Sequence, residues 1–232
     1  MPVPRFWQRI EDRYNAGLSQ QFLLYFNMDD LVWDDVYGYL PLRDFLMEQM
    51  NNRLGCNAVL SYSRSEGIKF PDLSLRDAYQ SAMKLTRIEE FEPLPENMPP
   101  VKRLNEDFRH VGEEALIRDT NEALIKLESF FRQGLGNARV GLIISDIEKL
   151  VPNRSFLPVS DQRVIDTETL LRWASDMQIK LRGHIILLLT ENMANVAPEL
   201  TMSDERATFP IEVPMPTYEE RLAYIRHLLY LP

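Results

Sequence analysis

The stretch VGLIISDIEKL, residues 140–150, indicates the fold class more directly than any other part of the chain. Its first five residues are apolar or small, and Ser145 and Asp146 follow them, so it has the form of a buried strand with a polar carboxyl end. HIILLLTEN, residues 184–192, repeats this form. Strands that are apolar on both faces are typical of parallel sheets covered by helices. Both stretches therefore predict central strands of such a sheet.

Segments of helical and strand character alternate along the rest of the chain. Apolar residues recur at helical spacing in residues 4–16, 41–55, 72–85, 121–134, 166–183 and 217–231. Apolar runs typical of strands lie at 20–26, 56–70, 139–145, 184–192 and 208–214, and the run at 56–70 contains the turn-like stretch SRSEG, residues 63–67. This alternation predicts an α/β fold with a three-layer architecture, in which a parallel sheet has helices on both faces. We expect residues 1–232 to form a single domain.

Two segments are predicted to lack regular structure. Residues 91–103 carry four prolines, which no helix or strand accommodates, and we expect a long surface loop there. Residues 27–41, NMDDLVWDDVYGYLP, are acidic and aromatic and are also predicted to be a loop. The acidic residues of this second segment lack the alternating ligand spacing and central glycine of a calcium loop, so solvated side chains are expected rather than a metal site.

Composition argues against several classes of protein. The chain has 35 Asp and Glu against 26 Lys and Arg, a net charge of -9, and a nucleic-acid surface needs clustered positive charge instead. Its one cysteine cannot form an internal disulfide, and its three histidines are scattered without metal-ligand spacing. No run of eighteen apolar residues could span a bilayer. We therefore expect a cytoplasmic protein with protein partners, no nucleic acid, no membrane and no metal.

Three stretches occur in the order of one known family. VGLIISDIEKL resembles the Walker B strand of AAA+ ATPases, and HIILLLTEN resembles the next strand, whose polar end is called sensor 1. ATFPIEVPMPTYEERLAYI, residues 207–225, resembles the fifth strand and the first helix of the lid. Over about residues 121–224 the chain is thus similar to the nucleotide-binding core of that family. The resemblance implies a P-loop-like topology, with residues 217–232 as the start of a lid that is missing or truncated.

The phosphate-binding loop of that family has no match in this sequence. An ATPase of this kind needs G-x-x-x-x-G-K-[ST] after its first strand, because glycine amides wrap the phosphates and the lysine neutralises them. No glycine here precedes a lysine, and residues 27–35 after the first predicted strand read NMDDLVWDD. We expect no cofactor in this chain, with ATP and magnesium held by a neighbouring module if at all. The cofactor-binding residues stay unassigned.

The resemblance places candidate catalytic residues at four positions. Asp146 and Glu148 lie in the Walker B region, where Ser145 falls at the metal-binding aspartate and Asp146 at the catalytic glutamate; in a register shifted by one residue, Asp146 is the metal ligand and Glu148 the base. Asn192 falls near sensor 1. Arg206 stands five residues before Ile211, as the family's arginine finger stands before its fifth strand, from where it acts on a neighbour's nucleotide.

Each candidate also has a plain structural interpretation. Ser145 and Asp146 fit any parallel strand with a polar carboxyl end. Asn192 fits a cap on the turn that leaves its strand. Arg206 fits a solvated arginine in the polar loop SDERAT. The apolar stripe of the last helix fits either a lid whose remainder lies in a longer chain or a helix docked on the domain or a partner.

Three functions follow from these alternatives. The first is a degenerate AAA+-like module without catalysis, which forms homo- or hetero-oligomers with AAA+ modules and serves assembly, regulation or partner recognition for an ATPase in the same longer chain or complex. The second is a divergent ATPase with an unorthodox nucleotide site, and the third is a stand-alone protein-interaction adaptor. The sequence leaves it open whether this chain is itself an enzyme.

Overall fold

The structure is a computed structural model that describes residues 3–70, 120–133, 138–153, 161–201 and 208–229. Its helices are α1 (Arg5–Asn15), α2 (Leu42–Asn52), α5 (Thr120–Gln133), α6 (Ile147–Leu150), α7 (Asp161–Ser175), α8 (Met177–Leu181), α9 (Pro198–Thr201) and α10 (Tyr218–Leu229), with a 3-10 turn η3 (Met193–Asn195). Its strands are β1 (Gln21–Phe26), β2 (Leu31–Asp34), β3 (Gly38–Pro41), β4 (Ala58–Ser63), β5 (Gly67–Lys69), β6 (Val140–Ile144), β7 (Ile185–Thr190) and β8 (Phe209–Val213). The helix predicted at 72–85 and the loop predicted at 91–103 lie outside the described residues.

The main sheet has the strand order β5-β4-β6-β7-β1-β8 within the described residues. All neighbouring strands are parallel except β4 and β5, which form an antiparallel hairpin at the edge. The prediction of a parallel sheet is therefore correct for five strands and wrong for β5. The run predicted at 56–70 forms both β4 and β5, and the turn between them lies at residues 64–66, within the stretch SRSEG that was predicted to be turn-like. Gly67, at the end of that turn, has a φ of 71°, which suits glycine.

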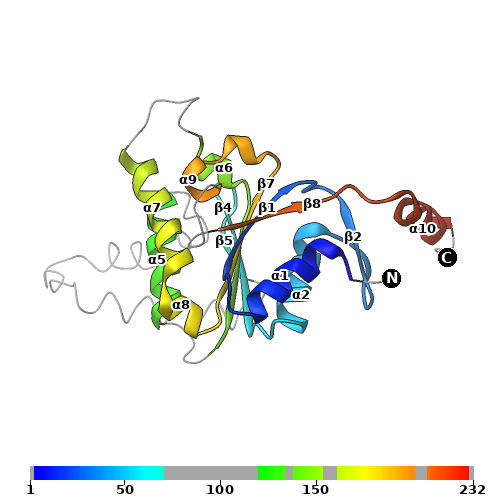
Figure 1. The fold of residues 1–232 in the computed structure, drawn as a ribbon, viewed down its shortest axis with the longest axis horizontal. Helices are drawn as coiled ribbons and strands as arrows, with labels where there is room; N and C mark the ends of the chain where they lie inside the picture. Colours follow the sequence, from blue (N-terminus) through cyan, green and yellow to red (C-terminus); the bar gives the residue numbers. More distant parts are fainter. Residues whose placement is uncertain (1–2, 71–119, 134–137, 154–160, 202–207, 230–232) are drawn as a thin grey trace, which may run out of the picture.

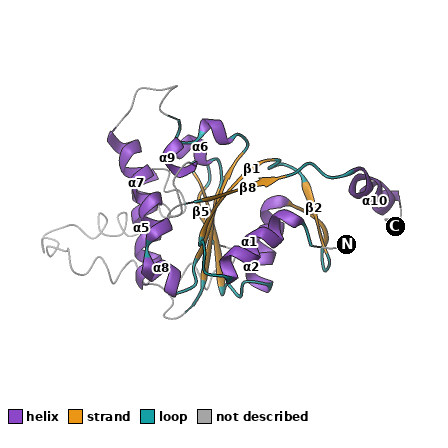
Figure 2. Ribbon diagram, viewed as in Figure 1, coloured by secondary structure: helices purple, strands orange, loops and turns teal. Residues whose placement is uncertain are grey.

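Helices cover both faces of this sheet, which confirms the predicted three-layer α/β architecture (Figure 1). Along β1, Leu23 packs with α5, α7 and α8, whereas Phe22 and Leu24 on either side of it pack with α1 and α2. This alternation follows from the two-residue period of a strand, and both faces are apolar because both are buried. Figure 2 shows the strands edge-on between the two helical layers.

The acidic segment predicted to be a loop is an antiparallel hairpin instead. Strands β2 and β3 pair from Leu31 with Pro41 to Asp34 with Gly38. Asp34 is only 5% exposed, and its carboxylate accepts the N–H groups of Val36 and Tyr37 at 2.8 and 3.0 Å. Because these bonds close the turn, a side chain predicted to be solvated holds the hairpin together.

The single helix predicted at 166–183 is broken into α7 and α8 at Asp176. The Asp176 side chain accepts the Gln178 N–H at 2.7 Å and so begins a new helix there. Buried Gln20 closes the break from the other side, since its amide nitrogen lies 2.9 and 3.2 Å from the carbonyls of Trp173 and Asp176. A distant side chain thus satisfies the carbonyls at the end of α7.

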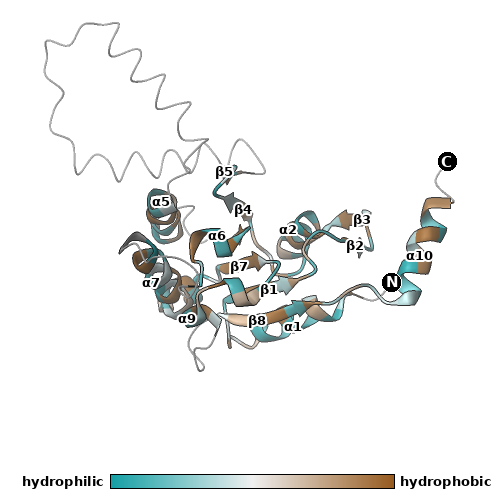
Figure 3. Cartoon of the chain, turned by 90° about the horizontal axis from the view of Figure 1, so that it is seen from above, coloured by the Kyte–Doolittle hydropathy of each residue, from teal (hydrophilic) through white to brown (hydrophobic). Residues whose placement is uncertain are grey.

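The last helix, α10, lies apart from the sheet and beside the β2–β3 hairpin (Figure 1). Tyr39 of β3 contacts the rings of Tyr224 and His227, with centroids 4.7 and 5.4 Å apart. Figure 3 shows hydrophobic positions along α10, and Ile225 and Leu229 are 52% and 75% exposed. Assignment of residues 217–232 to a lid stays a prediction. No helix among the described residues is both long and apolar enough to cross a membrane.

Candidate functional site

The candidate site lies at the carboxyl ends of β1, β6 and β7. The chain leaves β1 toward the layer of α2, whereas it leaves β6 and β7 toward the layer of α7 and α9. Neighbouring strands whose connections depart to opposite faces mark the switch point of an open α/β sheet, where ligands bind. Since β7 pairs in parallel with both β1 and β6, the carboxyl ends of the three strands lie at the same edge of the sheet.

The end of β6 positions Asp146 through an unusual backbone conformation. Asp146 has a φ of 55°, in the left-handed region that aspartate tolerates better than bulkier residues. It starts the short helix α6, and its carboxylate lies 3.0 Å from Nζ of Lys149. The i,i+3 spacing on α6 brings this ammonium to the carboxylate that the resemblance assigns to catalysis. Sequence reasoning missed Lys149, although its spacing from Asp146 was visible.

Other carboxylates surround the Lys149 ammonium. Its hydrogen bond to Asp146 raises the pKa of Lys149 first, and the charges of Asp146, Glu148 and Glu191 raise it further. Oε2 of Glu148 is buried and has no hydrogen-bond partner among the described residues. The acids that follow β6 and β7 thus surround a cation supplied by the chain itself.

Asn192 lies where sequence analysis placed it, just beyond β7. Its side-chain oxygen accepts the Ala194 N–H at 2.9 Å and begins the turn η3. This is the capping role that the plain structural interpretation predicts. Among the predicted residues, Arg206 lies outside the described ranges. Within those ranges, no group of three or more His, Cys, Asp or Glu side chains is arranged to hold a metal ion.

The connection after β1 is closed by its own hydrogen bonds. Asp30 accepts the side-chain amide of Asn27 at 2.9 Å and the N–H of Leu31 at 2.8 Å. Its backbone carbonyl accepts the first amide of α2, from Leu42, at 3.1 Å. Pro41 before Leu42 has no N–H to offer. An anion at the start of α2 would therefore find the first amide already bonded and the Asp30 side chain on the preceding connection.

Phe26 is the second backbone outlier at this edge. It has a φ of 92°, which is rare for a bulky residue, and its ring is 48% exposed. Such conformations persist only where the surrounding structure imposes them. Here the chain turns sharply from β1 into the Asn27–Asp30 hydrogen bonds. A sequence pattern gives no signal for this conformation because phenylalanine is not a residue that favours it.

The strand order, the two helical layers and the polar strand ends define an AAA+-like α/β module. The family model described as AAA+ chaperone, N-terminal Rossmann-like domain matches residues 1–214, and the chain belongs to this family. No curated protein sequence matches the chain significantly. Among solved structures it is similar to a chain in "Structure of E. coli MS115-1 HORMA:CdnC:Trip13 complex", with 10% identity and a TM-score of 0.42 over 96% of this chain. The match spans 66% of that chain.

Proposed function

We propose that this module does not hydrolyse nucleotide and serves assembly, regulation or partner recognition for an ATPase in the same longer chain or complex. The closed connection after β1 carries this proposal. A phosphate-binding loop needs several free backbone N–H groups and a cation at the start of the following helix. Here the Leu42 amide is bonded to the Asp30 carbonyl, and Arg43 in the first turn of α2 is paired with Glu66 at 3.0 Å.

The end of β6 supports the same proposal. A magnesium ion at Asp146 would compete with the ammonium of Lys149, which is already 3.0 Å from the carboxylate. Ser145, at the position of the metal-binding aspartate, is a neutral and weak ligand for a hard dication. ATP and magnesium would then belong to a neighbouring module. Arg206 would act there as a finger in trans, within a homo- or hetero-oligomer of AAA+ modules in the cytoplasm.

Nucleotide titration tests the absence of a site. We expect a fluorescent ATP analogue with magnesium to show no saturable binding at micromolar concentrations, because the first amide of α2 is already bonded and residues 27–52 contain no lysine to neutralise the phosphates. Asp146→Asn tolerates the left-handed backbone and removes the charge, so it is expected to leave the titration unchanged. Micromolar binding that Asp146→Asn or Glu148→Gln abolishes would contradict the proposal.

That contrary result would favour the second candidate, a divergent ATPase. One observation supports this candidate: the buried Oε2 of Glu148 lacks a partner among the described residues, close to Asp146 and Lys149. An unpaired buried carboxylate oxygen is costly unless it is used, and a general base is one such use. Asn192 would then position water as a sensor. Steady-state hydrolysis that Glu148→Gln abolishes would establish this role.

A turnover assay with the associated ATPase module tests Arg206. We expect Arg206→Ala to lower the turnover of the assembly by at least about tenfold, since a trans-acting arginine stabilises the charge of phosphoryl transfer. Arg64→Ala is the matched control, because it removes an exposed arginine that follows β4, and three strands separate β4 from β8. If this protein changes neither assembly nor turnover and Arg206→Ala is silent, the stand-alone adaptor is the better account.

A further inference from the structure

Three arginines four residues apart form a stripe along one flank of α1. This arginine stripe consists of Arg5, Arg9 and Arg13 and extends over about 12 Å of helix. Arg5 and Arg9 are exposed, and Arg13 is half-buried. Side chains four residues apart are neighbours on a helix, and like charges at this spacing destabilise it. The stripe is therefore a local concentration of positive charge on a chain whose net charge is -9.

The arginine stripe is not neutralised by the described part of the chain. None of its three residues takes part in an ion pair between described residues. The first turn of α1 carries no acidic residue. Asp12 lies on the same helix but is exposed and forms no ion pair among these residues either. The positive charge of the stripe thus remains available to a partner.

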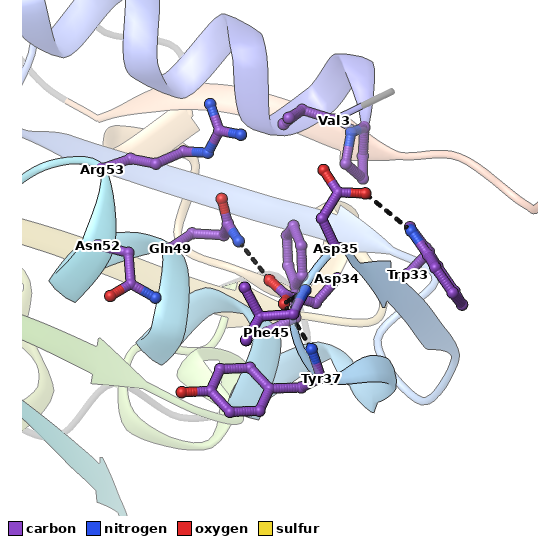
Figure 4. A pocket seen from close by; sticks show the side chains of 11 residues that line it. Val3, Trp33, Asp34, Asp35, Tyr37, Phe45, Gln49, Asn52 and Arg53 are labelled. Atoms are coloured by element: carbon purple, nitrogen blue, oxygen red, sulfur yellow. Dashed lines mark hydrogen bonds between the residues drawn. The ribbon is translucent and has the colours of Figure 1, made fainter. Parts of the chain in front are cut away.

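The charges between α1 and α2 are balanced instead. A pocket of about 400 Å³ lies there, lined by the segment ahead of α1, the β2–β3 hairpin and α2 (Figure 4). Asp35 accepts the Trp33 indole at 3.0 Å, and Asp34 accepts the amides of the hairpin turn. Arg53 lies 3.8 Å from Glu11 of α1. Each charged side chain that lines this pocket has a partner within the chain, in contrast to the stripe.

The arginine stripe borders the free edge of the main sheet. β8 is the last strand in the order of the sheet, and α1 lies beside it (Figure 3). The guanidinium carbon of Arg13 lies 3.6 Å from the ring centroid of Phe209 in β8, and that of Arg9 lies 5.8 Å from it. Both distances are within the range of cation–π contacts. The stripe is thus fixed against an edge strand.

Strand β8 brings no carboxylate to this face. Ile211 and Val213 pack on the side of α1, so Glu212 between them points to the opposite face of the sheet. Pro210 has no N–H, and a proline in an edge strand ordinarily turns its nitrogen to solvent. An added strand would find no donor there. A partner at this edge would therefore bind through side chains rather than by extending the sheet.

The stack on Phe209 prepares Arg13 to bind a carboxylate. A planar guanidinium that stacks on a ring keeps its in-plane donors free, and these match the two oxygens of a carboxylate. Nε of Arg13 is buried without a hydrogen-bond partner among the described residues. The two Nη groups, which are not buried in this way, are the donors left to a ligand.

We propose that the arginine stripe binds an acidic helical segment of a protein partner, with carboxylates four residues apart opposite Arg5, Arg9 and Arg13. Two helices with charges at the same spacing bring each carboxylate to one arginine. Nucleic acid fits less well, because its phosphates would continue beyond the stripe over an acidic molecule. The inference goes beyond the proposed function, since it does not depend on whether the strand ends bind nucleotide.

Fluorescence anisotropy with a labelled peptide tests this inference. The probe is an N-labelled, C-amidated alanine peptide that carries three glutamates four residues apart. We expect saturable binding that weakens as salt is added, because the stripe is at the surface. The same peptide with glutamine in place of glutamate is expected to bind at least about tenfold more weakly, since it lacks the charges that pair with the arginines.

Two variants separate the stripe from general attraction of anions. Arg9→Gln removes the central charge of the stripe at an exposed position and is expected to weaken binding about fivefold. Arg226→Gln makes the same change at an exposed arginine of α10 and is expected to change binding less than about twofold. Equal weakening by both variants, equal binding of the glutamine peptide, or tighter binding of a short DNA duplex than of the glutamate peptide would each overturn the proposal.

Discussion

Lowering the pH from neutral to about 4 is expected to remove about 3 kcal/mol of unfolding free energy through His184 alone. His184 is 1% exposed, at the start of β7. Its Nδ1 accepts the Val140 N–H at 3.0 Å, and its Nε2 lies 3.1 Å from the Phe131 carbonyl, to which it donates. The neutral ring with hydrogen on Nε2 satisfies both contacts. A second proton would sit on Nδ1, where the Val140 N–H already points.

Burial therefore lowers the pKa of His184 from 6.5 to about 4, more than the hydrogen bond to Phe131 raises it; the Arg182 charge lowers it slightly further. Between these two values the unfolded chain binds the proton and the folded chain does not, so stability rises with pH across this window. The contribution is complete above about 6.5 and is lost as the pH falls toward about 4. At about 1.36 kcal/mol for each pKa unit, the difference corresponds to about 3 kcal/mol.

Urea unfolding of wild type and a His184 variant at several pH values separates the contribution of His184 from that of carboxyl groups, which titrate in the same pH range. His184→Leu leaves the Val140 N–H without its acceptor, whereas the Phe131 carbonyl keeps the hydrogen bond from Arg182, and the variant is expected to cost about 1–3 kcal/mol at neutral pH. The difference in unfolding free energy between wild type and this variant should then decrease as the pH falls toward about 4. His227→Leu, at a ring-stacked position of α10, should keep the wild-type slope. A gap that stays constant with pH would show that His184 is protonated equally in both states.

The buried strands were predictable because their residues are apolar on both faces. HIILLLTEN predicted β7 to within two residues, since only a covered parallel sheet hides such a run completely. TFPIEVP predicted β8 to within one residue, although this edge strand is only partly buried. The segment 27–41 was not predictable in the same way. Its acidic residues suggested solvation, but Asp34 is buried because the turn amides and Gln49 supply it with donors. Those partners are set by tertiary structure.

The candidate site was predictable in position more than in chemistry. Asp146 and Asn192 lie at adjacent strand ends because parallel strands end at one edge, and the alternation of elements was enough to place them. The ion pair of Asp146 with Lys149 and the cap at Asn192 depend on local turns after each strand. The left-handed conformation of Asp146 has no signature in composition or periodicity, because aspartate adopts it in only a minority of its positions.

Trp7→Ala is expected to destabilise the protein by about 3–5 kcal/mol, among the largest effects of any single truncation here. Trp7 is 0% exposed and meets the ring of Phe45 edge to face, with centroids 6.3 Å apart. The buried residues of α1 are Phe6, Trp7 and Ile10. The indole of Trp7 is the largest of these side chains, so it contributes much of the packing of α1 against the sheet. Its N–H has no partner among the described residues, so packing accounts for the loss.

Thermal and urea unfolding of a matched series separate packing from other causes. Trp7→Phe keeps an aromatic ring against Phe45 and removes the unpaired N–H, and we expect it to cost about 1–2 kcal/mol. Gln8→Ala, an exposed neighbour on the same helix, should cost less than about 1 kcal/mol. If Trp7→Ala cost no more than Gln8→Ala, α1 would not be held by its buried face.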